Sequence, residues 1–360
     1  MPADPCCLDD YERLAQELLE PGPHGYFAGG AGDERTLRAN ASAWGTHALL
    51  PRVLVDVSEV STATTVMGTP VRMPVLVAPV AIQKMAHPDG EAGMARAAAA
   101  AGTIMTLSTI ATSTPAEVAL GAPEDAPRWF QVYVLSDRGV TRALVDEAVE
   151  HGYSALVLTV DAPRAGRRER DLRTQFAVPP GVDMPAVTAA VGGTAGVTPA
   201  AFFSLMDTSL TWEHLETFIA DSPLPVLVKG IHHPDDARLA VERGAAGIVV
   251  SNHGGRQLDN VPSTANLLGP VVEAVDGAVE VLVDGGIRRG TDVCAALALG
   301  ARAVLVGRPV LWGLTVGGEA GALRVLELLQ AEIELAMTLL GCAHVADVTA
   351  DRLARHHLTA

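Results

Sequence analysis

The chain has 360 residues, of which 49% are hydrophobic and 19% charged, a composition typical of a globular protein with one large domain or two average ones. Its net charge of −16 argues against a nucleic-acid partner, because contacts to a phosphate backbone need clustered Lys and Arg. A small anionic ligand stays possible, since a few arginines can reverse the sign of the field inside one cleft.

Neither metal binding nor disulfide formation is indicated by the four cysteines, whose spacing fits no common ligand or bridge pattern: Cys6, Cys7, Cys294 and Cys342. We therefore expect free thiols in a reducing compartment and no metal. The opening MPADPCCLDDYERL lacks the basic and apolar blocks of a signal peptide, and the uncharged runs 97–116 and 184–206 are broken by glycine, proline or hydroxyl residues. A cytoplasmic protein with no membrane contact is expected.

Residues 1–74 form an extension that precedes the regular part of the chain. An amphipathic helix is predicted around Tyr11 to Leu19, followed by the glycine-rich GYFAGGAGDE at residues 25–34. The segment TTVMGTPVRM (64–73) is typical of a β-hairpin, which we expect to lie over the floor of a barrel formed by residues 75–360. The extension is expected to pack on that barrel as part of a single domain.

From residue 75 the chain repeats one unit: a short β-branched apolar run, a break rich in Gly, Pro or Ser, and an Ala/Leu-rich helical stretch. The eight runs are 75–81, 103–109, 128–134, 155–162, 225–231, 247–254, 280–287 and 303–310. Near-continuous apolar runs predict parallel strands that are covered on both faces. Eight such units predict an α/β fold, a (β/α)8 TIM barrel. A doubly wound sheet is the alternative, but no strand leads into a GxGxxG turn and no GxxxxGK[ST] exists.

Boundary signals mark three of the helices between the strands. The helix after residue 136 begins at a Ser/Asp cap, and the helix of 233–247 has Pro234 in its first turn. Thr291 or Asp292 is predicted to cap the helix before the last strand. Residues 163–222 do not fit the repeat: this long excursion after the fourth strand is rich in Gly and Pro, and only LTWEHLETFIA (210–220) resembles a helix.

Polar and small residues gather where the predicted strands end, which is the face that carries chemistry in a TIM barrel. The first five strands end in Ala78, Pro79, Val80, Ala81, Ser108, Gln131, Tyr133, Thr159, Asp161 and Lys229. The sixth leads into Ser251, His253 and Arg256. The glycines between His253 and Arg256 allow backbone or ligand to come close.

The last two strands end in DGGIRRG (284–290) and GRP (307–309), which together resemble a phosphate cradle. Its members are Asp284, Gly285, Gly286, Arg288, Gly307 and Arg308. Glycines let backbone N–H groups approach an anion, guanidinium groups can fork onto it, and a predicted helix N-terminus follows each turn.

Asp161 and His253 come from opposite sides of the barrel mouth. A carboxylate beside an imidazole fixes its tautomer and favours the protonated form, an arrangement suited to a general base. Arg168 and Arg256 could hold a substrate carboxylate, because a guanidinium matches its two oxygens. Taken alone, RAGRRER (164–170) is more typical of a solvated basic turn.

With these residues placed, the chain resembles the FMN-dependent 2-hydroxy acid oxidase and dehydrogenase family, which includes glycolate, lactate and mandelate enzymes. The resemblance runs over nearly the whole chain, and SNHGGRQLD (251–259) is its most specific motif. The others are GYFAGGAGDE, APVAIQKMAHPDGE, FQVYV, LTVDAPRAGRRERD, PVLVKG, DGGIRRGTDV and VGRP.

The resemblance implies a role for each of these positions. Tyr26, Tyr133, Arg168 and Arg256 would grip the substrate, with His253 as base supported by Asp161. FMN would be bound by the residues at the ends of the strands: Ala78, Pro79, Val80, Ala81, Ser108, Gln131, Thr159, Lys229, Ser251, Asp284, Gly285, Gly286, Arg288, Gly307 and Arg308. Lys229 would stabilise the negative charge of reduced flavin.

The implied reaction oxidises an (S)-2-hydroxy acid to the 2-oxo acid, with either a carbanion or a hydride route. Relatives that act on short acids often carry a bulky aromatic residue at the position of Ile110, which together with the small Ala81 favours an aromatic substrate such as mandelate or 4-hydroxymandelate. Oxygen is the expected acceptor, giving hydrogen peroxide, and a homo-tetramer is the expected assembly. The alternatives are a glycolate or lactate oxidase, a quinone-linked dehydrogenase, a non-catalytic FMN-binding protein and a Schiff-base aldolase using Lys229.

Overall fold

A closed barrel of eight parallel strands forms the centre of the molecule in the computed structural model, which describes residues 5–191 and 199–354. Strand order around the barrel is β10-β3-β4-β5-β6-β7-β8-β9. The strands are β3 (Val75–Val77), β4 (Met105–Ser108), β5 (Arg128–Val132), β6 (Ala155–Thr159), β7 (Val226–Ile231), β8 (Gly247–Val250), β9 (Glu280–Asp284) and β10 (Ala303–Val306). The predicted (β/α)8 TIM barrel is confirmed, and each of the predicted apolar runs contains one strand.

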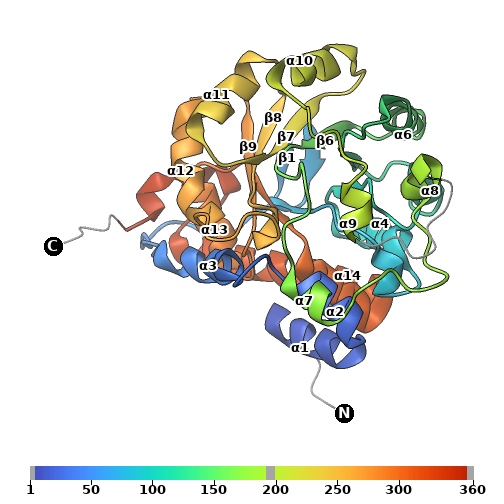
Figure 1. Cartoon of the computed structure of the whole chain (residues 1–360). Helices are drawn as coiled ribbons and strands as arrows, with labels where there is room; N and C mark the ends of the chain where they lie inside the picture. Colours follow the sequence, from blue (N-terminus) through green and yellow to red (C-terminus); the bar gives the residue numbers. More distant parts are fainter. Residues whose placement is uncertain (1–4, 192–198, 355–360) are drawn as a thin grey trace.

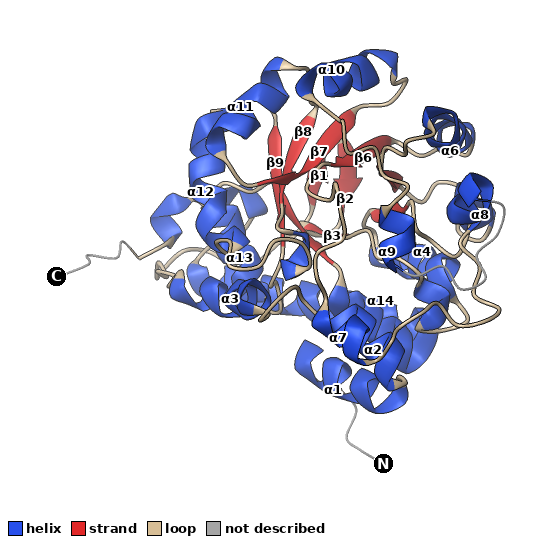
Figure 2. Cartoon of the chain, in the orientation of Figure 1, coloured by secondary structure: helices blue, strands red, loops and turns tan. Residues whose placement is uncertain are grey.

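Helices enclose this barrel, as Figure 2 shows with red strands inside a ring of blue helices. They are α4 (Gly90–Ala101), α5 (Pro115–Leu120), α6 (Arg138–Glu150), α11 (Pro234–Glu242), α12 (Thr264–Val275), α13 (Gly290–Ala298) and α14 (Arg308–Leu340), with α10 (Trp212–Asp221) ahead of β7. Short 3-10 turns add η1 (Trp44–Thr46), η2 (Gln83–Met85), η3 (His253–Gly255), η4 (Val345–Asp347) and η5 (Ala350–Arg352).

The predicted helix starts hold in two cases and fail in one. Asp137 caps α6 by accepting hydrogen bonds from the backbone N–H groups of Gly139 and Val140, and Pro234 opens α11. In α13 the cap is Arg289, not Thr291 or Asp292. The Asp292 carboxylate lies one turn inside the helix and reaches back to the backbone N–H groups of Arg288 and Arg289.

The interior of the barrel is filled by alternate side chains of its strands, among them Trp129, Leu227 and Leu282, all fully buried. The same cluster includes Val66 and Val71 from the hairpin of β1 (Thr64–Val66) and β2 (Thr69–Val71). The hairpin therefore closes the barrel floor as predicted, and the chemistry is left to the opposite end.

The described part of the N-terminal extension, residues 5–74, contains three α-helices: α1 (Leu8–Leu18), α2 (Pro21–Ala28) and α3 (Arg35–Ala43). Figure 1 shows α1, in blue, beside the long α14, in orange. The α3 helix contacts η3 at the end of β8, and α2 contacts α7 (Glu169–Arg173) of the excursion. The boundary between extension and barrel at residues 74 and 75 stays a prediction.

The excursion after β6 holds more structure than its sequence indicates. Besides α10 it contains α7, α8 (Pro185–Val191) and α9 (Pro199–Phe203), so the expectation of a single helix was wrong. Helices of five to seven residues carry too little periodicity to be recognised, and tertiary contacts stabilise them. Part of the uncharged run 184–206, residues 192–198, lies outside the described residues. Within the described ranges no helix is both long and apolar enough to cross a bilayer.

Candidate active site

A cavity of about 1040 Å³, a volume that includes space open to solvent, lies at the carboxyl ends of the strands. Every residue expected at the site lines this cavity except Asp161 and Ser251. Both lie directly behind its wall, where each holds a lining residue in place: Asp161 bonds His253, and Ser251 bonds Lys229. The predicted strand ends thus converge on one place.

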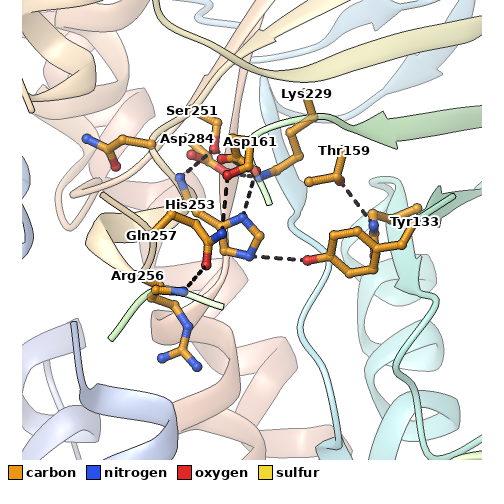
Figure 3. Close-up of polar contacts among 12 residues, drawn as sticks. Tyr133, Thr159, Asp161, Lys229, Ser251, His253, Arg256, Gln257 and Asp284 are labelled. Carbon is orange, nitrogen blue, oxygen red and sulfur yellow. Dashed lines mark hydrogen bonds and ion pairs between the residues drawn. The ribbon is translucent and has the colours of Figure 1, made fainter. Parts of the chain in front are cut away.

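Asp161, His253 and Tyr133 form a continuous chain of polar contacts, drawn in Figure 3. The Nδ1 atom of His253 lies 2.9 Å from Asp161 Oδ1, and its Nε2 atom lies 3.3 Å from the Tyr133 hydroxyl. Asp161 follows β6, Tyr133 follows β5 and His253 begins η3 after β8. Three different strands therefore supply the three groups.

The backbone at His253 is left-handed, with φ of +57°, a conformation that non-glycine residues adopt only at a cost. Its N–H donates to Ser251 Oγ at 3.1 Å, which helps to hold this geometry. Gly255 makes the turn possible, because a Cβ there would lie 2.7 Å from the backbone nitrogen of Leu37 in α3. The group that comes close to Gly255 is therefore the backbone of the N-terminal extension, not a ligand.

Burial lowers the pKa of His253 below its ordinary value, and the nearby Lys229 and Arg168 act in the same direction. Asp161 favours the protonated imidazole, as expected, but its effect is smaller than the opposing effect of burial, so the pKa stays below the ordinary value. Burial alone would raise the pKa of Asp161, but His253 and Lys229 hold it below its usual range. A neutral imidazole then donates from Nδ1 to the carboxylate and presents Nε2 as an acceptor.

The Tyr133 hydroxyl is the natural donor to that nitrogen. Burial raises its pKa well above the usual range, and the Asp161 carboxylate adds to the effect. The phenol therefore stays protonated. The Tyr133 hydroxyl and His253 Nε2, both neutral, can exchange the hydrogen bond between them for hydrogen bonds to a ligand oxygen in the cavity.

Two guanidinium groups lie beside this chain, those of the buried Arg168 and the half-buried Arg256. Arg256 Nη1 donates to the carbonyls of Tyr26 at 2.6 Å and Gly29 at 3.0 Å, and its guanidinium lies 5.0 Å from the centre of the Tyr26 ring. Burial and the neighbouring Arg168 lower the pKa of Arg256 to about 10. Arg168 is only 6% exposed, so the solvated-turn interpretation is wrong for this residue. Such a concentration of positive charge suits a carboxylate ligand.

Lys229 is buried at the end of β7, with its Nζ 3.0 Å from Asp284 Oδ2 and 2.9 Å from Ser251 Oγ. Burial would lower its pKa, but the carboxylates of Asp284 and Asp161 more than offset this and raise it. An ammonium group held in an ion pair is a poor nucleophile, which argues against the Schiff-base aldolase alternative. The neighbouring Gly230 has φ of +109°, and a Cβ there would lie 2.6 Å from that of Asp161.

The expected phosphate cradle carries the half-buried cations Arg288 and Arg308. Arg308 donates to the carbonyls of Phe27 at 2.9 Å, Gly29 at 2.9 Å and Gly254 at 3.0 Å, which ties the barrel end to α2. Burial, together with Arg256 and Arg288, lowers the pKa of Arg308 to about 9. These guanidinium groups repel one another, and a bound phosphate would relieve that repulsion.

FMN fits this set of groups. Asp284 lines the cavity, and its buried Oδ1 accepts no hydrogen bond from the described residues, so it can receive one from a ligand hydroxyl. Arg288, Arg308 and the start of α14 can hold a phosphate, while the ammonium of Lys229 lies deeper in the same cavity. The cavity thus offers an anion site, a hydroxyl acceptor and a buried cation.

Several lining residues were missed from the sequence. Most are apolar and carry no chemical signal: Phe27, Ile287, Leu305, Val306, Pro309 and Leu311. Phe203 comes from α9 in the excursion, where no sequence pattern singled it out. Gln257, inside the recognised motif, does not line the cavity but was overlooked as a support of the site; its Nε2 donates to the carbonyls of Asp161 at 3.2 Å and Arg164 at 2.8 Å.

All four cysteines are free thiols, as expected. Cys6, Cys7 and Asp10 place potential ligand atoms within 4.8 Å of one another, a grouping that the sequence analysis did not anticipate. All three lie at or before the first turn of α1, the helix whose Glu12 forms an ion pair with the cavity-lining Arg288.

Comparison with known proteins defines the class. The family described as FMN-dependent dehydrogenase matches residues 15–355, and the chain belongs to it. It is therefore an FMN-dependent enzyme that oxidises a 2-hydroxy acid, as the resemblance implied.

Individual relatives differ in the substrates that they are named for. The chain is 49% identical to L-lactate oxidase of Nostoc sp. over 354 residues, covering 96% of this chain and 97% of the relative. It is 46% identical to glycolate oxidase 3 of Oryza sativa subsp. indica over 363 residues, with 98% of both chains covered. A crystal structure of mandelate oxidase is 43% identical and superposes with a TM-score of 0.90 over 97% of this chain and 98% of that one.

Proposed function

We propose that this enzyme oxidises an aromatic (S)-2-hydroxy acid, of the mandelate or 4-hydroxymandelate type, with oxygen as the acceptor. The observation that supports this proposal most directly is that Ile110 and the small Ala81 line the same cavity as the His253–Tyr133 pair. Similarity to mandelate oxidase supports the proposal. Similarity to lactate and glycolate oxidases favours the alternative, a short-chain acid.

His253 is proposed as the base that removes a proton from the substrate. Its Nε2 atom faces the cavity beside the Tyr133 hydroxyl, and burial keeps the imidazole neutral and able to accept. Asp161 would stabilise the imidazolium that results and fix the ring by its bond to Nδ1. This assignment holds whether the hydroxyl proton or the α-proton leaves first.

Arg168 and Arg256 are proposed to bind the substrate carboxylate, with Tyr26 and Tyr133 completing the grip. The two guanidinium groups reach the cavity from the excursion and from the turn after β8, on the same side as His253. Charge-assisted hydrogen bonds to a carboxylate would orient the substrate carbon toward Nε2.

Bound FMN supplies the two-electron acceptor of the reaction. Lys229 is proposed to place its positive charge beside the flavin ring, and Arg288 and Arg308 to hold the phosphate. The remaining proposed contacts to FMN come from the strand ends: Ala78, Pro79, Val80, Ala81, Ser108, Gln131, Thr159, Ser251, Asp284, Gly285, Gly286 and Gly307.

The test is a visible spectrum recorded before and after (S)-mandelate is added without oxygen, followed by air. Bleaching of the flavin band and fast recovery in air support an aryl hydroxy acid oxidase. Bleaching without fast recovery would indicate a quinone-linked dehydrogenase instead. Bleaching by lactate or glycolate but not by mandelate would overturn the substrate.

We further propose that the enzyme is a homo-oligomer, a tetramer in the family pattern. An exposed apolar patch supports this: Val53 and Leu54 on the segment beside the end of α14, with Leu335 and Leu339 on α14 itself. Leu54 is fully exposed and left-handed, with φ of +60°, an arrangement that is costly in a monomer. Light scattering should give a mass of several chains, reduced in Leu54→Asp; a monomeric wild type would overturn the proposal.

A further inference from the structure

The end of the excursion is attached to the strand that carries Tyr133. The Ser136 N–H donates to the Leu205 carbonyl at 2.8 Å, and the Asp207 N–H donates to the Val134 carbonyl at 2.9 Å. Leu135 and Met206 form an antiparallel bridge between these bonds. The residues just after α9 are therefore joined to those just after Tyr133, and this part of the excursion is fixed against the barrel mouth.

This attachment places Phe203, the last residue of α9, in the cavity wall. Its ring centre lies 6.0 Å from that of Tyr133 at an interplanar angle of 65°, and the Arg168 guanidinium lies 5.7 Å from the same centre. Phe202 also packs against this ring, with centres 5.7 Å apart, and is itself only 1% exposed. A side chain packed on two sides in this way presents a rigid aromatic surface.

Phe203 contacts two of the residues that are proposed to bind the substrate. Arg168 belongs to the carboxylate clamp, and Tyr133 is the partner of the base. If Arg168 holds the carboxylate of a 2-hydroxy acid and Tyr133 its hydroxyl, the side chain on the same carbon is the one large substituent that neither group binds. Phe203 and Ile110 are apolar residues of the cavity that can receive this substituent.

We infer that Phe203 determines substrate specificity, as an aromatic wall that favours 2-hydroxy acids with an aryl side chain. This inference rests on the proposed function. Ring-to-ring packing contributes beyond the burial of area alone, and glycolate has no side chain with which to make it. The choice between aryl and short-chain substrates therefore depends on Phe203 of the excursion as well as on Ile110.

The experiment compares kcat/KM for (S)-mandelate and glycolate in the FMN-loaded wild type, Phe203→Ala and Phe203→Leu. Phe203→Ala should lose roughly 10- to 100-fold with mandelate and change by less than about 3-fold with glycolate. Phe203→Leu, which keeps most of the volume, should show a smaller loss in the same direction. Phe218→Ala on α10 is the matched control, an aromatic truncation in the same excursion that does not line the cavity.

Binding provides a readout that does not depend on turnover. Perturbation of the flavin spectrum should show weaker binding of benzoylformate to Phe203→Ala and unchanged binding of pyruvate. An unchanged mandelate-to-glycolate ratio would overturn the inference. An equal loss with both acids would also overturn it, because Phe203 would then act only through Arg168. A wild type that prefers glycolate contradicts the proposed substrate, whereas the change in ratio still tests Phe203.

Discussion

Asp161 and His253 are separated by 92 positions in the chain, yet Asp161 Oδ1 and His253 Nδ1 are 2.9 Å apart. Both lie in loops directly after their strands, β6 and β8, which border β7 on its two sides. Gly230 at the end of β7 leaves room for Asp161. The pair is thus a product of the barrel order, in which the side chain of Lys229 also approaches the carboxylate.

His253→Gln should retain bound FMN and lose most turnover. Glutamine keeps a polar side chain of similar size but cannot accept a proton, and general bases contribute roughly 10²- to 10⁴-fold to rate. The flavin spectrum and kcat with mandelate measure the two properties. His151→Gln, at the carboxyl end of α6, is the control; turnover of His253→Gln close to that of the wild type would refute the role.

The pH dependence of kcat/KM should show its acid limb below pH 6.5. Burial keeps the pKa of His253 under its ordinary value of 6.5, so the free enzyme holds a neutral base until the pH falls further. The same shift makes the contribution of His253 to stability complete above pH 6.5 and lost as the pH falls through the lower folded-state pKa.

Asp161→Asn tests the cause of this limb. The Asp161 carboxylate raises the pKa of His253 against the effect of burial, so its removal should move the acid limb to lower pH and reduce kcat. A limb that moves to higher pH would contradict the assignment of charges within the pair.

Arg256→Met should weaken acid binding more than it slows the reaction. A charged hydrogen bond contributes about 1.5–3 kcal/mol, which corresponds to a roughly 10- to 150-fold rise in KM for mandelate. Arg167→Met is a suitable control, because that side chain is 75% exposed on the same basic segment as Arg168. An unchanged KM in Arg256→Met would count against the carboxylate clamp.

Lys229→Met should destabilise the protein and weaken FMN binding. The substitution leaves the buried carboxylate of Asp284 without its cation, a loss of about 3–5 kcal/mol in the free energy of unfolding. The double variant Lys229→Met/Asp284→Asn should recover part of that stability, as measured by urea unfolding. If the single and double variants are equally unstable, the ion pair is not the cause.

Gly230→Ala should lower both stability and kcat. Its φ of +109° costs an alanine about 1–3 kcal/mol, and the added Cβ would push Asp161 away from His253. Thermal unfolding and mandelate turnover are the measurements. Gly152→Ala is the matched control, because that glycine is also left-handed but has open space around it; a loss of kcat equal to that of the control would argue against the contact with Asp161.

Much of the fold and of the site follows from local pattern. Parallel strands in a barrel are covered on both faces, so each appears as an apolar run, and the residue after each run must lie at the cavity mouth. For this reason His253, Lys229 and Arg308 could be named without coordinates. The motif around His253 was specific enough to indicate FMN and a hydroxy acid.

Other features depend on contacts between distant segments, which no local pattern records. Phe203 lies in a five-residue helix that is placed by bonds to the end of β5, and the backbone at Gly255 is set by α3 of the extension. The net direction of the His253 pKa shift could not be derived from the sequence, because burial, which only the tertiary structure reveals, outweighs the neighbouring carboxylate. The sequence by itself thus determined the barrel, the cofactor and the polar residues at the ends of the strands, whereas the folded structure decided the direction of the His253 pKa shift and the packing of Phe203 against Tyr133 in the cavity wall.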